Sequence, residues 1–418
     1  MLATVRQRFL LALQYRDYRT LWTANVCAGA AAWALIVARG WLAFDTTESS
    51  LWVGVVTFMA MAPRFFVTPF IGYLADRFDR RTLLSYAYAL QLVHAVVLAL
   101  MLMTGKLDTW SLVVLSLVNG SLRASEITAN QSLVPNLVPR EHLGNAVALG
   151  QATQQSSRLV GPLAIAPLLA LVNLEAAFWL CGVFYGGALA QSLRIATRSR
   201  GEIDRSRGII GSLVDGFEYV YSRPLVLAMV LLAVLHCSLT MSFEAMLPVL
   251  SDEILDAGSS GVSLLMTGVG IGALAMSVSL AGVRSDAIRG RMFLLLGTGS
   301  GLAPIGLALS SQTELSILAV AAMGASQAGF MTITHTIIQS IVDDGVRGRV
   351  SGIYSMHVGG SMAVANLTNA TLADLLNAPL VLAVGGVVFI GVVTASIGAN
   401  PLRRIYFARP VGAPSAAG

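Results

Sequence analysis

The sequence predicts an all-α membrane protein with twelve transmembrane helices in two pseudo-symmetric six-helix bundles. Three observations lead to this fold class: the composition, the recurrence of long apolar runs, and a repeat between the two halves of the chain. The 418 residues are 56% hydrophobic and only 12% charged, with a mean hydropathy of +0.73. A soluble globule of this size needs more polar surface than such a chain supplies.

Apolar runs follow one another along the chain with short polar breaks, and about 20 apolar residues cross a bilayer as a helix. We predict spans at residues 20–44, 51–75, 82–104, 109–135, 144–170, 175–194, 224–250, 260–283, 291–310, 314–339, 350–374 and 379–399. The first run is too long for a cleavable signal peptide and lacks a small-residue cleavage site, so we expect it to remain as a helix.

Arginine is concentrated in alternate loops, whereas the other loops carry acidic residues and the single lysine, Lys106. By the positive-inside rule, this pattern places both termini in the cytoplasm, with the chain crossing a bacterial inner membrane many times. The same pattern explains the net charge of +5 without a nucleic-acid partner.

The longest polar segment divides the predicted spans into six and six. Its end, IIGSLVDGFEYVYS, has the apolar spacing of a short amphipathic helix on the membrane surface. We therefore predict an N-terminal bundle at 1–194, a cytoplasmic linker at 195–223, a C-terminal bundle at 224–399 and a cytoplasmic tail at 400–418.

An internal repeat links the two halves. A shift of 210 residues lays GYLADRFDRR at 72–81 over GVRSDAIRGR at 282–291, and a shift of 208 lays QSLVPNLVPREHLG over QSIVDDGVRGRVSG. Both pairs follow equivalent predicted spans in their halves. The halves therefore look like parallel repeats, an architecture typical of secondary transporters.

GYLADRFDRR resembles the loop signature of the major facilitator superfamily. LADRFDRRTLL, LVPNLVPREHLGNAVAL and RLVGPLAIAP are most similar to its enterobactin-exporter-like and macrolide-efflux-like branch, and the resemblance covers essentially the whole chain. It implies a cytoplasmic gating motif made of Gly72, Asp76, Arg77, Arg80, Arg81, Asp286 and Arg291. It also implies an antiporter-like motif at Gly161 and Pro162, which would kink its helix and let it pack closely. Asp79 stands where many members have glycine, and Ala287 where the repeat would place an arginine.

Six charged residues lie well within predicted spans, away from their ends, where each costs about 2.5 to 3.5 kcal/mol at a helix centre, so they must face water or one another. They are Arg39, Arg64, Arg123, Glu126, Arg158 and Glu244. Helical spacing places Asn119, Arg123, Glu126 and Asn130 on one face, and Gln151, Gln155 and Arg158 on another. We predict a substrate cavity lined by Asn25, Arg39, Arg64, Asn119, Arg123, Gln155 and Arg158.

The roles of these charges differ. Arg123 and Glu126 can form an i, i+3 pair, so a structural ion pair is an equal alternative for both. Arg64 and Arg158 have no acidic neighbour in sequence and are the better substrate candidates. Glu244 is the first candidate for proton coupling, since no basic residue lies near it in sequence, and Glu126 is the second.

The predicted function is secondary active transport: a proton-coupled exporter of an amphiphilic small molecule, such as a siderophore or a drug-like compound. The excess of arginine in the cavity favours an anionic substrate. We expect a monomer in contact with membrane lipid, without cofactor, metal or nucleic acid. Two alternatives stay open: a lipid or lysolipid transporter, and a non-transporting sensor or assembly factor of transporter fold. HExxH, GxSxG and phosphate-loop motifs do not occur, so an enzyme is not expected.

Overall fold

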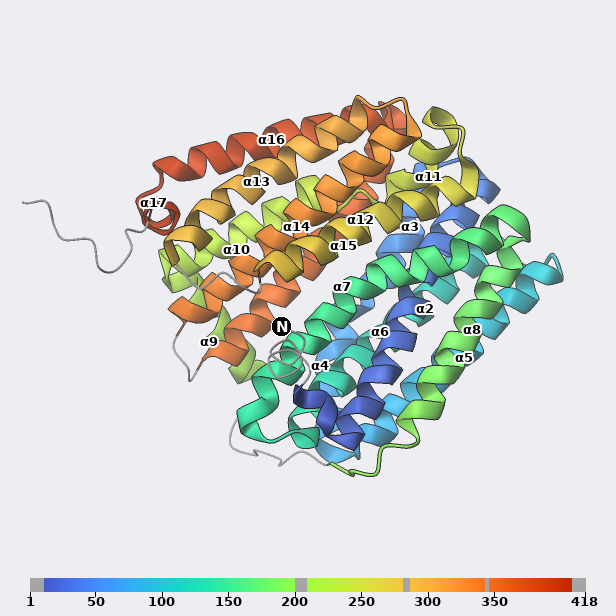
Figure 1. The fold of residues 1–418 in the computed structure, drawn as a ribbon, viewed down its shortest axis with the longest axis horizontal. Coiled ribbons are helices and arrows are strands. Elements are labelled where there is room, and N and C mark those ends of the chain that lie inside the picture. Colours follow the sequence, from blue (N-terminus) through green and yellow to red (C-terminus); the bar gives the residue numbers. More distant parts are fainter. Residues whose placement is uncertain (1–10, 200–208, 281–285, 343–345, 408–418) are drawn as a thin grey trace, which may run out of the picture.

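The structure is a computed structural model that describes residues 11–199, 209–280, 286–342 and 346–407. All regular secondary structure within these ranges is helical. Figure 1 shows the first half of the chain, in blue to green, beside the second half, in yellow to red.

The first half begins with a short turn of 3-10 helix and continues as long α-helices. Its elements are η1 (Leu11–Gln14), α2 (Arg16–Thr47), α3 (Ser50–Met61), α4 (Pro63–Arg77), α5 (Arg80–Met103), α6 (Thr109–Leu137), α7 (Arg140–Leu171) and α8 (Leu174–Ser192). The second half contains α9 (Ile209–Ser222), α10 (Pro224–His236), η2 (Cys237–Met241), η3 (Glu244–Met246), α11 (Leu247–Val249), η4 (Leu250–Ile254), α12 (Gly258–Leu280), α13 (Asp286–Ala308), α14 (Thr313–Ile341), α15 (Arg347–Leu375), α16 (Ala378–Gly398) and α17 (Asn400–Tyr406).

Eight helical stretches in the described ranges are long and apolar enough to cross a membrane. They begin at Arg16, Ser50, Arg80, Pro224, Gly258, Ile288, Thr313 and Ala378. Four other helices, α6, α7, α8 and α15, have 29, 32, 19 and 29 residues and reach a similar length with a more polar composition. A helix of about 20 residues spans some 30 Å, so these four are also long enough to cross.

Short polar side chains in the loops define where several helices begin. Asp79, Asp108, Asn173 and Asn377 each accept a hydrogen bond from the backbone N–H three residues later, at the starts of α5, α6, α8 and α16. Such N-caps satisfy amide groups that the first turn of a helix leaves free. The acidic and amide residues of these loops thus mark where the following helices start.

Two predicted spans are broken. The stretch predicted at 51–75 divides into α3 and α4 at Pro63, which lacks an N–H and occupies the first helical position of α4. The span predicted at 224–250 is found as an apolar helical stretch that begins at Pro224, but it is not one regular α-helix: α10 ends at His236, and π and 3-10 turns follow.

Side chains from neighbouring helices satisfy the carbonyl groups that this second break exposes. The Asn369 amide on α15 donates to the carbonyls of Ser238 (3.2 Å) and Ser242 (2.9 Å). The Gln327 amide on α14 donates to the carbonyl of Thr240 (2.7 Å). In an apolar environment such replacement partners are what make a broken helix tolerable. The break places Glu244 between the two halves.

The amphipathic helix predicted at the end of the polar linker is confirmed as α9. It packs on α15, where the Tyr221 hydroxyl lies 3.0 Å from Nε2 of His357 and the Phe217 ring lies 5.8 Å from the same imidazole. The linker residues 200–208 lie outside the described ranges.

Helices pack mainly against others of the same half, and the two halves meet along two seams. In the first half α2 packs on α7 and α8, and α5 packs on α6 and α8; in the second, α14 packs on α12 and α13, and α13 on α16. The seams are α7 against α12 and α3 against α15. At Gly270 of α12 a Cβ atom would lie 2.5 Å from the backbone nitrogen of Leu159, so only glycine permits the α7–α12 approach.

Candidate functional site

Two oppositely charged side chains meet where α7 faces the break after α10. Nη2 of Arg158 lies 3.7 Å from Oε1 of Glu244, and both side chains are only 8% exposed. Neither residue has an opposite charge nearby in sequence, and the tertiary structure brings the two together. The two residues belong to different halves of the chain, so their proximity depends on how the halves pack.

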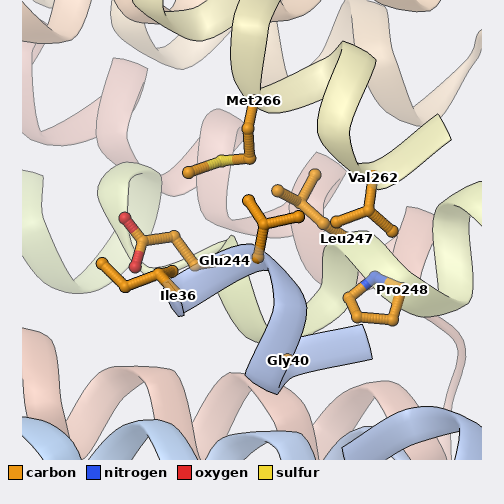
Figure 2. Close-up of a pocket in the computed structure, with 8 residues that line it drawn as sticks. Ile36, Gly40, Glu244, Leu247, Pro248, Val262 and Met266 are labelled. Carbon is orange, nitrogen blue, oxygen red and sulfur yellow. The ribbon is translucent and has the colours of Figure 1, made fainter. Parts of the chain in front are cut away.

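Apolar side chains surround the Glu244 carboxylate on the side of α2 and α12. Ile36, Val37, Gly40, Leu247, Pro248, Val262 and Met266 line a narrow pocket with it. In Figure 2 the carboxylate lies between Met266 and Ile36, with Leu247, Val262 and Pro248 beyond it. The pocket has room for roughly one water molecule. Glu244 is the one ionisable residue among those that line it.

Arg158 also contacts an aromatic ring. Its guanidinium carbon lies 4.6 Å from the centroid of Trp33 on α2, within the range of a cation–π interaction. Its Nε is buried and has no hydrogen-bond partner. Arg158 is therefore held by a ring face and a carboxylate, and Trp33 is a residue of the site that the charge pattern alone did not reveal.

A buried polar chain crosses the first half. Nη1 of Arg39 donates to Oδ1 of Asn119 (2.9 Å), and Nδ2 of Asn119 donates to Oε1 of Gln91 on α5 (2.9 Å). All three side chains are buried. The predicted cavity residues Arg39 and Asn119 are thus hydrogen-bonded to each other. Gln91 was not predicted as a site residue, because it is isolated in an otherwise apolar run.

Arg123 and Glu126 form an ion pair on α6, as the structural alternative predicted. The second carboxylate oxygen of Glu126 is buried without a hydrogen-bond partner, and so is the hydroxyl of Tyr185 on α8. These two groups lie within electrostatic range of each other. Tyr185 could not be singled out from the sequence, since it lies in a run of apolar and small residues.

The remaining predicted cavity residues are less buried. Nδ2 of Asn25 donates to Oδ1 of Asn130 (3.2 Å), and the Tyr88 hydroxyl donates to Oδ1 of Asn25 (3.1 Å). Gln155 is half-buried, and Arg64 is exposed. Arg64 lies within electrostatic range of Arg123, Glu126 and Glu244, so it is the exposed member of a group of charges from both halves.

The predicted gating motif is described only in part. The backbones of Gly72, Asp76 and Arg77 lie at the end of α4 and that of Asp286 at the start of α13, and their side chains lie outside the described part. Arg291 is exposed. No contact of the described residues therefore tests the gating role of these five.

Arg80 and Arg81 bind within the first half. Nη1 of Arg80 donates to the carbonyl of Ser132 (2.9 Å) and to Oδ1 of Asn136 (2.8 Å). Nη2 of Arg81 donates to the carbonyl of Leu193 (2.6 Å). These contacts join the α4–α5 loop to the adjacent ends of α6 and α8.

Asp79 extends this junction to the segment after α8. It accepts hydrogen bonds from the backbone N–H of Ser199 (2.9 Å) and from the Thr82 hydroxyl (2.8 Å). Partial burial alone would raise the pKa of Asp79, but the hydrogen bonds from Ser199 and Thr82 and the charge of Arg81 outweigh it and lower the pKa. Asp79 is therefore a structural residue of this loop.

At the α3–α15 seam, hydrogen bonds join the end of α15 to the start of α3. The Asp374 carboxylate, at the end of α15, accepts hydrogen bonds from the backbone N–H groups of Ser50 (2.7 Å) and Leu51 (3.0 Å) and from the Ser49 hydroxyl (2.5 Å). A carboxylate at a helix N-terminus accepts hydrogen bonds from the free N–H groups and interacts favourably with the positive end of the helix dipole. One side chain of the second half thus caps a helix of the first.

Comparison with known proteins gives one family and several relatives. A family model described as transmembrane secretion effector matches residues 10–404. The staphyloferrin A transporter of Staphylococcus aureus is 21% identical over 82% of this chain and 86% of its own length. The macrolide efflux protein A of Streptococcus pyogenes is 21% identical over 85% and 89%. The enterobactin exporter of Escherichia coli is 23% identical over 74% of each chain.

Solved transporter structures share the fold. A peptide transporter superposes with a TM-score of 0.75 at 10% identity, covering 92% of this chain and 95% of its own. A nucleoside transporter superposes with a TM-score of 0.69 at 11% identity, covering 92% and 98%. At such identities the likeness concerns the fold and not the substrate.

Proposed function

Because the chain belongs to the transmembrane secretion effector family of major facilitator transporters, we propose that it is a proton-coupled exporter of an amphiphilic, anionic small molecule. Its family and relatives are membrane transporters and not enzymes. The proposal includes the twelve-span arrangement in two bundles, with both termini in the cytoplasm of a bacterial inner membrane. It also includes a monomeric transporter in contact with lipid.

The observation that carries the proposal is the contact between Arg158 and Glu244. The two charges come from different halves, are nearly excluded from solvent and have no hydrogen bond between them. A buried ion pair is stabilised only while both partners stay charged. Protonation of Glu244 therefore removes the electrostatic link across the halves and leaves Arg158 as an uncompensated cation.

An uncompensated buried arginine binds an anionic group strongly, because its guanidinium presents planar donors that match carboxylate or phosphate oxygens. In the proposed cycle Arg158 binds Glu244 when the carboxyl is ionised and the substrate when it is protonated. Arg64, the exposed cation of the same charge group, provides the first contact for an anion that enters. Proton and substrate binding are then linked, because the substrate anion and the ionised Glu244 carboxylate compete for the same guanidinium.

A second candidate is a transporter-shaped protein that does not transport. The observation in its favour is that Arg123 and Glu126 neutralise each other and that Arg39 already donates a hydrogen bond to Asn119 without any ligand. The two candidates differ in whether an imposed pH gradient moves a solute.

The test begins with a thermal-shift screen of the purified protein against anionic siderophores, macrolides, dyes and lysolipids. The strongest stabiliser is then loaded into proteoliposomes, and its movement is followed with and without a pH gradient. We expect accumulation that depends on the gradient and collapses with a protonophore. Binding of a compound that is not transported would support the non-transporting candidate. Transport of a lysolipid alone would support a lipid transporter.

A further inference from the structure

We propose that Trp33 positions Arg158 and keeps its guanidinium from closing onto Glu244, and that Trp33 thereby sets the pH range in which Glu244 exchanges its proton. This inference rests on the proposed role of Glu244 and adds a residue that carries no charge. Three features of the site lead to it: the length of the ion pair, the placement of the ring, and the helix approach that fixes the ring.

The distance between Arg158 and Glu244 is longer than is usual for a buried ion pair. A buried arginine and carboxylate that are free to approach form hydrogen bonds of about 2.7 to 2.9 Å, often two in parallel. Here Nη2 and Oε1 are 3.7 Å apart, although both side chains are only 8% exposed. The buried Nε of Arg158 also lacks a partner, so the guanidinium is not held away by competing hydrogen bonds at that atom.

The Trp33 ring supplies the competing interaction. Its centroid lies 4.6 Å from the guanidinium carbon, and attraction between a cation and a tryptophan face is strongest when both are removed from water. Because this attraction weakens as the cation leaves the ring, it opposes any displacement of the guanidinium that carries it from Trp33 toward the Glu244 carboxylate. The position of Arg158 is therefore a balance between the ring and Glu244.

Gly161 fixes the ring in this place. It follows Arg158 by three residues on α7, so the two lie on neighbouring positions of one helix face. A Cβ atom at Gly161 would lie 2.8 Å from Cβ of Trp33 and 2.5 Å from the carbonyl oxygen of Ala30. Only glycine lets α2 approach α7 this closely, and this approach brings Trp33 onto Arg158.

The other charges near Glu244 do not explain the effect. Arg158 on α7, Arg64 on α4 and Arg39 on α2 lie within electrostatic range of its carboxylate. Trp33 is neutral and acts through Arg158 alone. When the ring is removed, the guanidinium moves toward the carboxylate and stabilises its ionised form, so a higher proton concentration is needed to protonate Glu244.

The experiment follows protonation of Glu244 directly. Infrared difference spectra of the purified protein in lipid nanodiscs are recorded over a pH series, and the carboxylic acid band that Glu244→Gln removes is assigned to Glu244. We expect Trp33→Leu to move the midpoint of this band to lower pH by about one unit, a tenfold change in proton concentration. Trp33→Phe keeps an aromatic face and should move the midpoint less in the same direction.

Trp22 provides the matched control. It lies on the same helix as Trp33 and also faces α7, where its Nε1 donates to the Thr153 hydroxyl (2.7 Å). Trp22→Leu should leave the midpoint where the unmodified protein has it. Equal shifts in the Trp22 and Trp33 variants, an unchanged midpoint in Trp33→Leu, or a shift to higher pH would each overturn the inference. So would the absence of any band that depends on Glu244.

If Trp33→Leu does not fold, Trp33→Phe carries the test through its smaller shift. Transport is measured in parallel with the same variants. A shifted midpoint together with transport that ignores the pH gradient would overturn the proposed coupling and leave the role of Trp33 standing.

Discussion

The two halves of the chain stabilise polar groups inside their predicted spans by different means. The first half contains five charged residues well within its spans, and it pairs Arg123 with Glu126 and Arg39 with Asn119. The second half contains Glu244 alone well within its spans, and the other buried polar groups among its described residues are amides, hydroxyls and His236. The charge of Glu244 is compensated by Arg158 of the first half. Its stability therefore depends on the contact between halves, whereas the charges of α6 are compensated locally.

The largest expected effect separates the two glutamates. Glu244→Gln should abolish solute accumulation driven by a pH gradient, since the amide neither binds a proton nor holds Arg158. Glu126→Gln should keep coupled transport, because Glu126 is bound within its own helix. Accumulation and simple exchange are measured in proteoliposomes for both variants. If the Glu244→Gln variant still accumulated solute, Glu244 would have no role in coupling that Glu126 lacks.

The next effect concerns the local pair. Arg123→Leu should lower the free energy of unfolding by about 3 kcal/mol, because it leaves the buried Glu126 carboxylate uncompensated. The double variant Arg123→Leu with Glu126→Leu should recover most of this loss. Denaturation in mild detergent, followed by circular dichroism, gives both values. A double variant no more stable than the single one would show that the pair is not compensated locally.

A smaller effect is expected where the second half uses a neutral amide. Asn369→Leu leaves the carbonyls of Ser238 and Ser242 without this donor, which should cost about 1 to 3 kcal/mol. Thr371→Val is a suitable control, because the Thr371 hydroxyl only donates within its own helix, to the carbonyl of Leu367. Equal stability of the Asn369 variant and the control would mean that the break after α10 does not depend on α15.

The smallest effect lies outside the spans, at Asp79. Asp79→Ala removes the N-cap of α5 and should cost about 1 kcal/mol at neutral pH. Because the pKa of Asp79 is lowered below 3.8 in the folded protein, the stabilisation from its charge is fully present above that value. It is lost as the pH falls through the lowered pKa. Unfolding at a series of pH values should therefore show the difference between variant and unmodified protein shrinking only in strong acid.

Much of the architecture could be predicted from the sequence. The apolar runs located the long helices, the spacing of IIGSLVDGFEYVYS located α9, and the i, i+3 spacing of Arg123 and Glu126 predicted their pair. The resemblance to major facilitator exporters is confirmed by the family match over residues 10–404. Each of these features depends on residues close together in the sequence or on the composition of long segments.

The site could be predicted only in part. The charged residues were identified as costly and hence functional, but the pairing of Arg158 with Glu244 was not predicted, because neither residue has an opposite charge nearby in sequence. The break after α10 was missed, since the side chains that stabilise it, Gln327 and Asn369, come from helices more than 80 residues further along the chain. Trp33 carries no charge and stands out only through its contact with Arg158.

The sequence by itself determined that this chain is a helical membrane protein, because hydrophobicity and helical periodicity act over short stretches of any chain in a bilayer, and the resemblance of its loop motifs to the major facilitator superfamily indicated a transporter. The tertiary structure decided which charges compensate one another. Electrostatic and cation–π interactions in an apolar interior depend on separations of a few ångströms, and these are set by the packing of helices that lie far apart in the sequence.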